Sequence, residues 1–317
     1  MDGQFGITQR RDVGGELLMP AVAALSGLGR NLRPYQFQIG EVIFGRHTPY
    51  PVEKVDISSY TVNNQDFQVP MSNETRMGID TKQAGPMTFT LGVIDNAPVS
   101  RSVVGLPDDL VAKSSKLLTA LQTEWKANAA TKQYGEMQPL IYCDGYGAVR
   151  RIYGRPRKFT YTRKSPKSLF YRVTAEYARA DTLTYSDVEY AAALTQGADL
   201  VEYSQLGDAD SWLRVLLTGP MTNPVIQVGD STIQLQIEID EGMLVELSSY
   251  PWARRIVSAP ADGGPLINQR RAMVGQTRYL DQIMMPAGLP VGMSYVAADT
   301  TTASGCLVLW RDAHNVV

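Results

Sequence analysis

The chain has 317 residues, with 30 Lys and Arg against 32 Asp and Glu, so its formal net charge is −2. This length is ample for at least one sizeable hydrophobic core, and the charge balance excludes the strong basic field typical of proteins that bind nucleic acid through phosphates. The two cysteines, Cys143 and Cys306, lie far apart, so the sequence predicts neither a disulfide framework nor a Cys-pair zinc site.

Residues 1–34 are predicted to form an N-terminal arm, and the sequence leaves its role open. Arg10-Arg11 before the apolar run 17–25 resembles an export signal, but Pro20 interrupts the run and no small-residue cleavage site follows. No other stretch approaches the roughly 20 apolar residues needed to cross a bilayer. We therefore expect a soluble protein without export or membrane insertion.

Residues 35–95 contain short runs rich in Val, Ile, Phe, Tyr and Thr, broken by Gly, Pro and Asn-Asn, which is typical of an antiparallel meander. A long polar stretch, 63–82, lies within this region. A helix is expected next, from Pro107 to about Asn128, because Pro and two acids stand in its first turn and Leu and Trp recur on one face. This helix is expected to pack against a sheet.

Strand patterns resume at 138, with hairpin turns predicted at 144–147 and 164–167. The interval 191–210 loses this periodicity, so we place a domain boundary there. The predicted organisation is an arm, a first domain of sheet plus one helix, a linker and a second domain, over residues 1–34, 35–195, 196–210 and 211–317.

The second domain is predicted to be an all-β sandwich, because turn signals recur at short, even intervals. Its clearest strand is 232–240, in which Ile or Leu alternates with a polar residue. Pro251 is expected to end a strand or form a turn, and Trp252 to pack in or at the edge of the sandwich. A saccharide contact formed by Trp252 and Arg254 stays open as an alternative.

The sequence predicts no enzyme, and no metal or cofactor site. His47 and His314 accompany no G-x-S-x-G elbow. Glu238, Asp240 and Glu241 could form a carboxylate pair for glycoside hydrolysis, but alternating charges usually form the solvated face of a strand.

The strongest local charge feature is a basic segment, 150–164, in which Tyr and Phe are interleaved. Such a pattern could stack single-stranded nucleic acid. Because the whole chain is acidic, we favour a strand pair whose cations meet acids on a neighbouring subunit. The candidate subunit-interface residues are Arg150, Arg151, Arg155, Arg157, Lys158 and Arg163.

Three segments in this order together resemble the distal tail proteins of long-tailed (siphovirus-type) bacteriophages. They are the strands 149–185, the turn 216–226, and the region from Tyr250-Pro-Trp252 to Trp310-Arg-Asp312. In its most specific form, the resemblance is to a minor tail protein of an actinobacterial-type phage. It implies a tail-tube-like first domain, β-rich with one helix, that assembles as a hexameric ring, followed by a galectin-like sandwich.

The same resemblance implies a structural virion protein at the tail tip, made in the host cytoplasm. Its implied partners are further copies of itself, the tail tube protein above, and tail-tip hub or tail-associated proteins below. Genome DNA would pass through the lumen without specific binding, so the basic segment is expected at subunit contacts or outside the ring. The family supplies no catalytic residues. A host-surface carbohydrate-binding tail-tip module is the alternative function.

Overall fold

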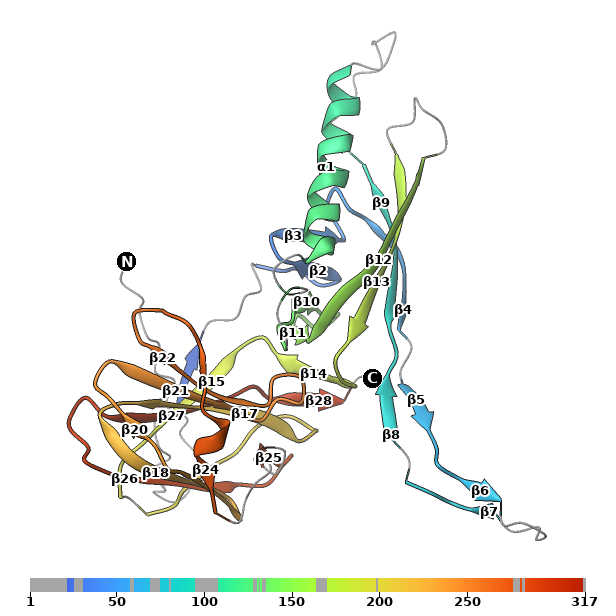
Figure 1. The fold of residues 1–317 in the computed structure, drawn as a ribbon. Coiled ribbons are helices and arrows are strands. Elements are labelled where there is room, and N and C mark those ends of the chain that lie inside the picture. The colour runs from blue at the N-terminus through green and yellow to red at the C-terminus, as the bar shows by residue number, and fades with distance from the viewer. Residues whose placement is uncertain are drawn as a thin grey trace, which may run out of the picture. The chain divides into compact units, whose positions relative to one another are not determined.

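A computed structural model describes residues 22–25, 31–57, 60–68, 75–79, 81–94, 108–127, 130, 132, 135–163, 170–197, 199–275, 280 and 283–315. These residues form a mainly β protein with one long helix, as predicted (Figure 1). The chain divides into two compact units. Leu28–Thr184 forms the first, here called the helix unit, and Tyr185–Asn315 together with the N-terminal residues up to Gly27 forms the second, here called the sandwich unit.

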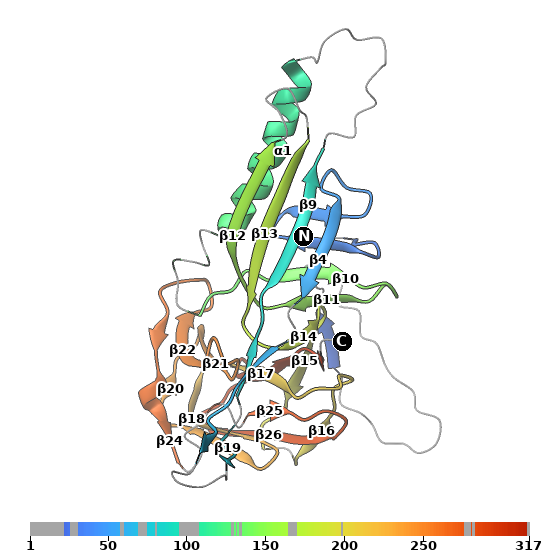
Figure 2. The same ribbon diagram turned by 90° about the vertical axis from the view of Figure 1, so that its right-hand side faces the viewer.

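The helix unit is built around a four-stranded antiparallel sheet. Its strands are β4 (Val52–Ile57), β9 (Met87–Val93), β12 (Gly154–Arg163) and β13 (Tyr171–Arg179), in the order β12-β13-β9-β4. Helix α1 (Asp108–Lys126) packs across one face of this sheet (Figure 2). Buried and more exposed residues alternate along β13, so one face of the sheet is packed and the other meets solvent.

A second layer of strands completes the helix unit. It comprises β2 (Gln36–Ile39), β3 (Val42–Gly45), β10 (Leu140–Cys143) and β11 (Val149–Ile152), hydrogen-bonded in the order β11-β10-β2-β3, while β14 (Leu183–Ser186) spans the division between the units. Trp125 of α1 lies at the centre of the core, edge-on to Phe44 and Phe89, and its Nε1 donates to the carbonyl of Glu176. The predicted helix and its packing are therefore confirmed.

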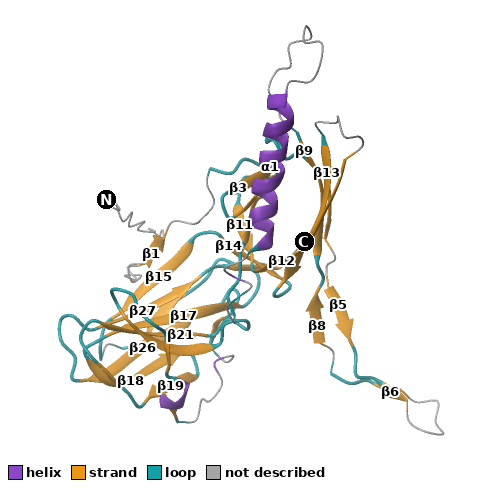
Figure 3. Ribbon diagram, turned by 45° about the horizontal axis from the view of Figure 1, so that its top comes forward, coloured by secondary structure: helices purple, strands orange, loops and turns teal. Residues whose placement is uncertain are grey.

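The polar stretch 63–82 lies within a two-stranded ribbon, here called the arm (residues 60–84). Strand β5 (Tyr60–Asn63) pairs with β8 (Thr81–Ala84), and farther out β6 (Phe67–Gln68) pairs with β7 (Thr75–Arg76). The arm continues β4 and β9 away from the four-stranded sheet (Figures 1 and 3).

The sandwich unit consists of two packed sheets, which confirms the predicted all-β character of this region. The first sheet has the order β1-β15-β27-β17-β21-β22-β23, with strands β1 (Val22–Leu25), β15 (Glu189–Leu194), β17 (Ser211–Thr218), β21 (Met243–Ser248), β22 (Arg255–Pro260), β23 (Ile267–Asn268) and β27 (Gly305–Trp310), and β25 (Met284–Met285) added beside β17. The second has the order β16-β26-β18-β19-β24, with strands β16 (Val201–Tyr203), β18 (Met221–Val228), β19 (Ser231–Leu235), β24 (Met273–Val274) and β26 (Val291–Ala298), and β20 (Glu238–Ile239) beside β18. A short 3-10 helix (Arg270–Ala272) and strand β28 (Ala313–Asn315) complete the unit.

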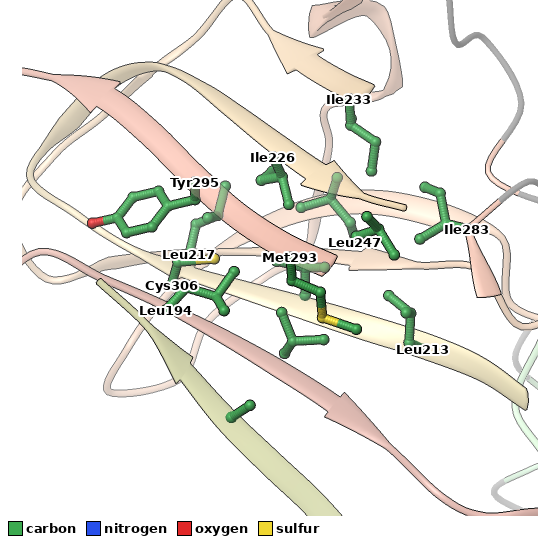
Figure 4. Close-up of a cluster of buried hydrophobic side chains, with 14 of the residues drawn as sticks. Leu194, Leu213, Leu217, Ile226, Ile233, Leu247, Ile283, Met293, Tyr295 and Cys306 are labelled. Atoms are coloured by element: carbon green, nitrogen blue, oxygen red, sulfur yellow. The ribbon is translucent and has the colours of Figure 1, made fainter. Parts of the chain in front are cut away.

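The core of the sandwich lies between its two sheets (Figure 4). Leu217 from one sheet and Ile226, Ile233 and Met293 from the other are fully buried there. The predicted strand 232–240 occurs as β19 and β20, and the break between them lies opposite Asn223 of β18, which has a left-handed φ of 47° and donates its N–H to the Ile237 carbonyl.

The division between the units differs from the predicted linker at 196–210. Strand β15, predicted in the first domain, pairs with β27 of the sandwich. The predicted linker contains β16, which pairs with β26. Gln205 in the same segment is 4% exposed: its Nε2 donates to the carbonyls of Ala209 and Met285, and its Oε1 accepts from Ala313 N. Val201, Tyr203 and Gln205 alternate inward along this segment, but only the first two are apolar and the next inward position holds a buried amide, so the apolar alternation is too short to mark a strand.

Part of the N-terminal segment, predicted as residues 1–34, also contributes to the sandwich unit. Val22–Leu25 forms β1, which pairs with β15 at the edge of the first sheet, from Val22 opposite Ala192 to Leu25 opposite Glu189. The described part of the chain therefore starts with a strand of the sandwich unit, passes through the helix unit and returns.

The predicted hairpin turn at 144–147 is confirmed. It connects β10 to β11, and the Asp144 carboxylate accepts hydrogen bonds from the backbone amides of Tyr146 and Ala148. The turn predicted at 164–167 lies outside the described residues.

Both cysteines are buried, Cys143 at 3% and Cys306 at 2% exposure. Burial raises the pKa of the Cys306 thiol to about 12, and burial followed by the charge of Asp144 raises the pKa of Cys143. Because the thiolate is the reactive form, we expect a thiol reagent at about pH 8 to label neither cysteine in the native protein and both after denaturation. Rapid labelling of the native protein, followed by mass spectrometry, would contradict this.

Candidate subunit interface

The four-stranded sheet of the helix unit is open at both edges. Among the described residues, β12 and β4 are each hydrogen-bonded to one strand only, β13 and β9 respectively. All neighbouring strands are antiparallel, so the two edge strands run in opposite directions. An open edge presents unpaired backbone N–H and C=O groups, which makes it a template for another strand.

Both edges carry a β-bulge with charged residues. On β12 the register shifts between Pro156 and Phe159, and the two residues in between, Arg157 and Lys158, are exposed. On β4 the register shifts between Val52 and Lys54. Bulges and edge cations oppose indiscriminate strand pairing, so both edges carry features that protect an open edge.

The structure separates the six basic candidates according to their side-chain environment. Arg151 is 4% exposed, with its guanidinium 5.9 Å from the centroid of the Tyr153 ring. Arg150 lies 3.7 Å from the Asp144 carboxylate. Both side chains are therefore engaged within the subunit.

The four basic candidates on β12 also differ in whether their side chains make contacts within the subunit. Arg155 Nε donates to the carbonyl of Glu136 at 2.8 Å, and the guanidinium of Arg163 lies 5.1 Å from the Tyr171 ring centroid. Arg157 and Lys158 at the bulge are exposed. Sequence reasoning treated the basic segment as one block because a bulge is not visible in the residue pattern.

The solvent-facing side of the four-stranded sheet is rich in hydroxyl groups. Its polar residues include Thr88, Thr90, Thr160, Thr162 and Thr174. Two ion pairs lie on this face: Lys54 Nζ lies 2.8 Å from Asp56 Oδ1, and Arg172 donates to Glu53 at 2.7 Å. This face was not among the predicted sites, although threonine at every second position in TFT and TYT is a sequence signal for it.

The arm has one apolar and one polar face. Tyr60 and Val62 share a face and are 49% and 44% exposed, and Lys82 Nζ lies 5.0 Å from the Tyr60 ring centroid. On the other face Asn63 donates to Gln83 Oε1. Large apolar side chains are also exposed at the base of the arm and farther along it, namely Ile57 at 47%, Met77 at 79% and Ile79 at 76%.

Trp252 packs at the edge of the sandwich unit. It is half-buried, with its ring centroid 5.2 Å from that of Tyr250 and 6.3 Å from that of Tyr185. Arg254 is exposed, and its guanidinium lies 5.9 Å from the ring centroid of Trp212. A saccharide contact at Trp252 and Arg254 stays a prediction.

The acidic and histidine residues considered as catalytic candidates do not form a cluster in the described residues. Glu238, Asp240 and Glu241 are exposed, and His314 lies 3.7 Å from Asp208 near the carboxyl end. Within the described ranges no group of three or more His, Cys, Asp or Glu side chains is placed to hold a metal ion. No helix in the same part of the chain has the length and apolarity to span a membrane.

No family model and no curated protein matches the chain. Solved structures do match the chain. The Dit protein (gp 19.1) of phage SPP1, described as a paradigm of the hub adsorption apparatus in phages that infect Gram-positive bacteria, matches with a TM-score of 0.53 and 12% identity over 88% of this chain and 98% of that chain. The chain shares the fold of a phage hub protein.

Two structures of the phage P2 baseplate in its activated conformation show the same fold. The form with Ca matches with a TM-score of 0.53 and 8% identity over 89% of this chain and 98% of the matched chain. The form with Sr matches with a TM-score of 0.53 and 9% identity, over 86% and 97%. Since the three matches cover 86–89% of this chain and each unit is about half of it, both units share this fold.

Proposed function

We propose that the protein is a structural, non-enzymatic virion component: a ring-forming hub at the distal end of a phage tail. It would join the tail tube to tail-tip or baseplate proteins around a lumen that conducts DNA. The observation that carries this proposal is the four-stranded sheet, which α1 covers on one face and which is open at both edges. The shared fold with phage hub and baseplate proteins supports it. An actinobacterial-type phage as the source stays a prediction.

Ring closure satisfies both open edges at once. In a head-to-tail ring, β12 of one copy lies beside β4 of the next, and the opposite directions of these strands continue the antiparallel alternation around the ring. Closure of the rotation leaves no edge exposed. By family resemblance, the ring contains six copies.

The hydroxyl-rich face of the sheet suits the wall of the lumen. A protein holds DNA mainly by neutralising phosphates with Lys and Arg, each contact releasing counterions. On this face Lys54 and Arg172 are paired with Asp56 and Glu53. Threonine hydroxyls and paired charges allow DNA to slide with little net attraction.

The arm supplies a second contact between copies. An isolated two-stranded ribbon is at best marginally stable in water, and an alternating apolar and polar pattern is typical of a sheet with one buried face. The Tyr60 and Val62 side chains remain about half exposed in the single subunit. A neighbouring copy that covers this face would stabilise the arm and the ring together.

Negative-stain microscopy of the purified full-length protein tests the proposal. We expect closed rings with a central hole, and a mass of six subunits by light scattering. A monomer at concentrations of about 10 μM and above, or compact particles without a hole, would overturn the hub function, since specific permanent assemblies associate well below this range.

A further inference from the structure

The two units carry opposite net charges. Residues 28–184 contain 21 Lys and Arg against 14 Asp and Glu, a formal charge of +7. The remaining residues contain 9 Lys and Arg against 18 Asp and Glu, a charge of −9, and no lysine follows Lys167. A ring of helix units therefore brings together units that all carry a positive net charge. Their mutual repulsion has to be offset where the copies touch.

The two open edges are matched for such a contact. Strand β12 carries four cations, Arg155, Arg157, Lys158 and Arg163, and no acid. Strand β4 carries Glu53, Lys54 and Asp56, with a net charge of −1. Asp56 already pairs with Lys54 through Oδ1 within the subunit, but a carboxylate can accept further donors, so the pair does not prevent Asp56 from meeting a cation of a second copy. The edge that is basic on one copy thus faces an edge that is acidic on the next in a head-to-tail ring.

The register of the sheet places these charges at the same level. Asp56 lies opposite Thr88, which lies opposite Glu176. The bulge of β12 falls between the pair Pro156–Tyr177 and the pair Phe159–Ala175, so Arg157 and Lys158 also stand beside Glu176. One row perpendicular to the strands therefore runs from the basic bulge at one edge to Asp56 at the other.

A neighbouring row fixes the expected alignment of the backbones. Thr160 on β12 lies opposite Thr174, which lies opposite Thr90, which lies opposite Lys54 on β4. If copies join with their rows level, Thr160 of one copy lies beside Lys54 of the next.

We propose that the subunit contact is a charge-matched edge pairing, in which the basic bulge at Arg157 and Lys158 of one copy docks beside Asp56 of a second copy. This inference rests on the proposed ring and names its contact and register. The bulge then has two effects: it prevents β12 from pairing with a strand that lacks a matching acid, and it sets the register in which the next copy is accepted.

Charge reversal tests the pairing in the full-length protein. In the variant with Arg157→Glu and Lys158→Glu, the association constant between copies at about 0.15 M salt should fall about tenfold or more, since like charges then face each other. Asp56→Lys alone should have a similar effect, and combining all three substitutions should restore most of the lost affinity. At about 1 M salt the differences should shrink, because the Debye length falls to about 3 Å.

A matched control separates the contact from net charge. Arg270 and Arg271 are exposed neighbours in the short 3-10 helix of the sandwich unit and belong to neither edge strand, so Arg270→Glu combined with Arg271→Glu changes the net charge as much as the bulge variant does. Its association constant should stay within about twofold of the wild type, the scale of isolated surface charges. Circular dichroism checks that each variant is folded. If both variants weaken association equally, or if Asp56→Lys does not restore the affinity of the bulge variant, the proposed contact is wrong. Rings formed by the wild-type protein would still support the hub function in that case.

Cross-linking tests the register independently. Both natural cysteines are buried, so a protein carrying Thr160→Cys and Lys54→Cys presents two new accessible thiols per copy. Mild oxidation should convert rings into covalent ladders up to the full ring, whereas Thr160→Cys with Thr90→Cys, on the inner strand β9, should stay unlinked. Rings that form but yield no ladder would refute the level register.

Discussion

Replacing Tyr60 and Val62 of the arm by aspartate should abolish ring formation and leave a folded monomer. Both side chains are about half exposed in the single subunit and share one face of the ribbon, where the proposed ring covers them. Losing this burial costs about 2–4 kcal/mol at each contact between copies, on the usual scale for a Val and an aromatic side chain. Because every contact in a closed ring is affected, the loss accumulates. Sedimentation velocity measures the outcome.

The polar face of the same strand provides the control. Thr61→Asp with Asn63→Asp introduces the same two charges at the same spacing, but on the face that carries the Asn63–Gln83 hydrogen bond. This variant should still form rings. If both double variants assemble as the wild type does, the arm does not contribute to the ring; if both fail, negative charge on the ribbon rather than lost burial is the cause.

Trp125→Ala should lower the free energy of unfolding of the helix unit by about 3–5 kcal/mol, the usual cost of truncating a large buried aromatic residue. Trp125 is 3% exposed, its ring contacts those of Phe44, Phe89 and Phe159, and its Nε1 hydrogen bond to the Glu176 carbonyl is also lost. A helix unit of this size should melt roughly 6–20 °C lower, at about 2–4 °C per kcal/mol. Urea and thermal unfolding followed by circular dichroism measure both quantities.

Trp252→Ala serves as the comparison in the sandwich unit. Its indole is half-buried against Tyr185 and Tyr250, so less apolar surface is lost and the cost should be about half that of Trp125→Ala or less. Equal destabilisation by the two substitutions would mean that the loop at Trp252 contributes more to the sandwich than its burial indicates.

Local patterns were sufficient for the element types. The helix was predictable because Pro107 and two acids mark its start and Leu117, Leu121 and Trp125 recur on one face, which is the face that the core buries. The sandwich was predictable because Ile233, Leu235, Ile237 and Ile239 stand at every second position and all pack in or against the core. Both signals depend only on residues within one or two turns or strands, so they can be read without knowing the fold.

Long-range strand pairing decided the features of the fold that local sequence patterns did not predict. The return of β1 to β15 and the attachment of the predicted linker through Gln205 join residues more than a hundred positions apart, and no local period marks such a partner. For the same reason the basic segment looked uniform: only the ladder with β13 reveals a bulge that exposes Arg157 and Lys158. The amino-acid sequence determined which strands and which helix form, through side-chain periodicity and capping. Only the tertiary structure decided which edges stay open and which charges lie on them, because register is a property of paired strands and not of either strand alone.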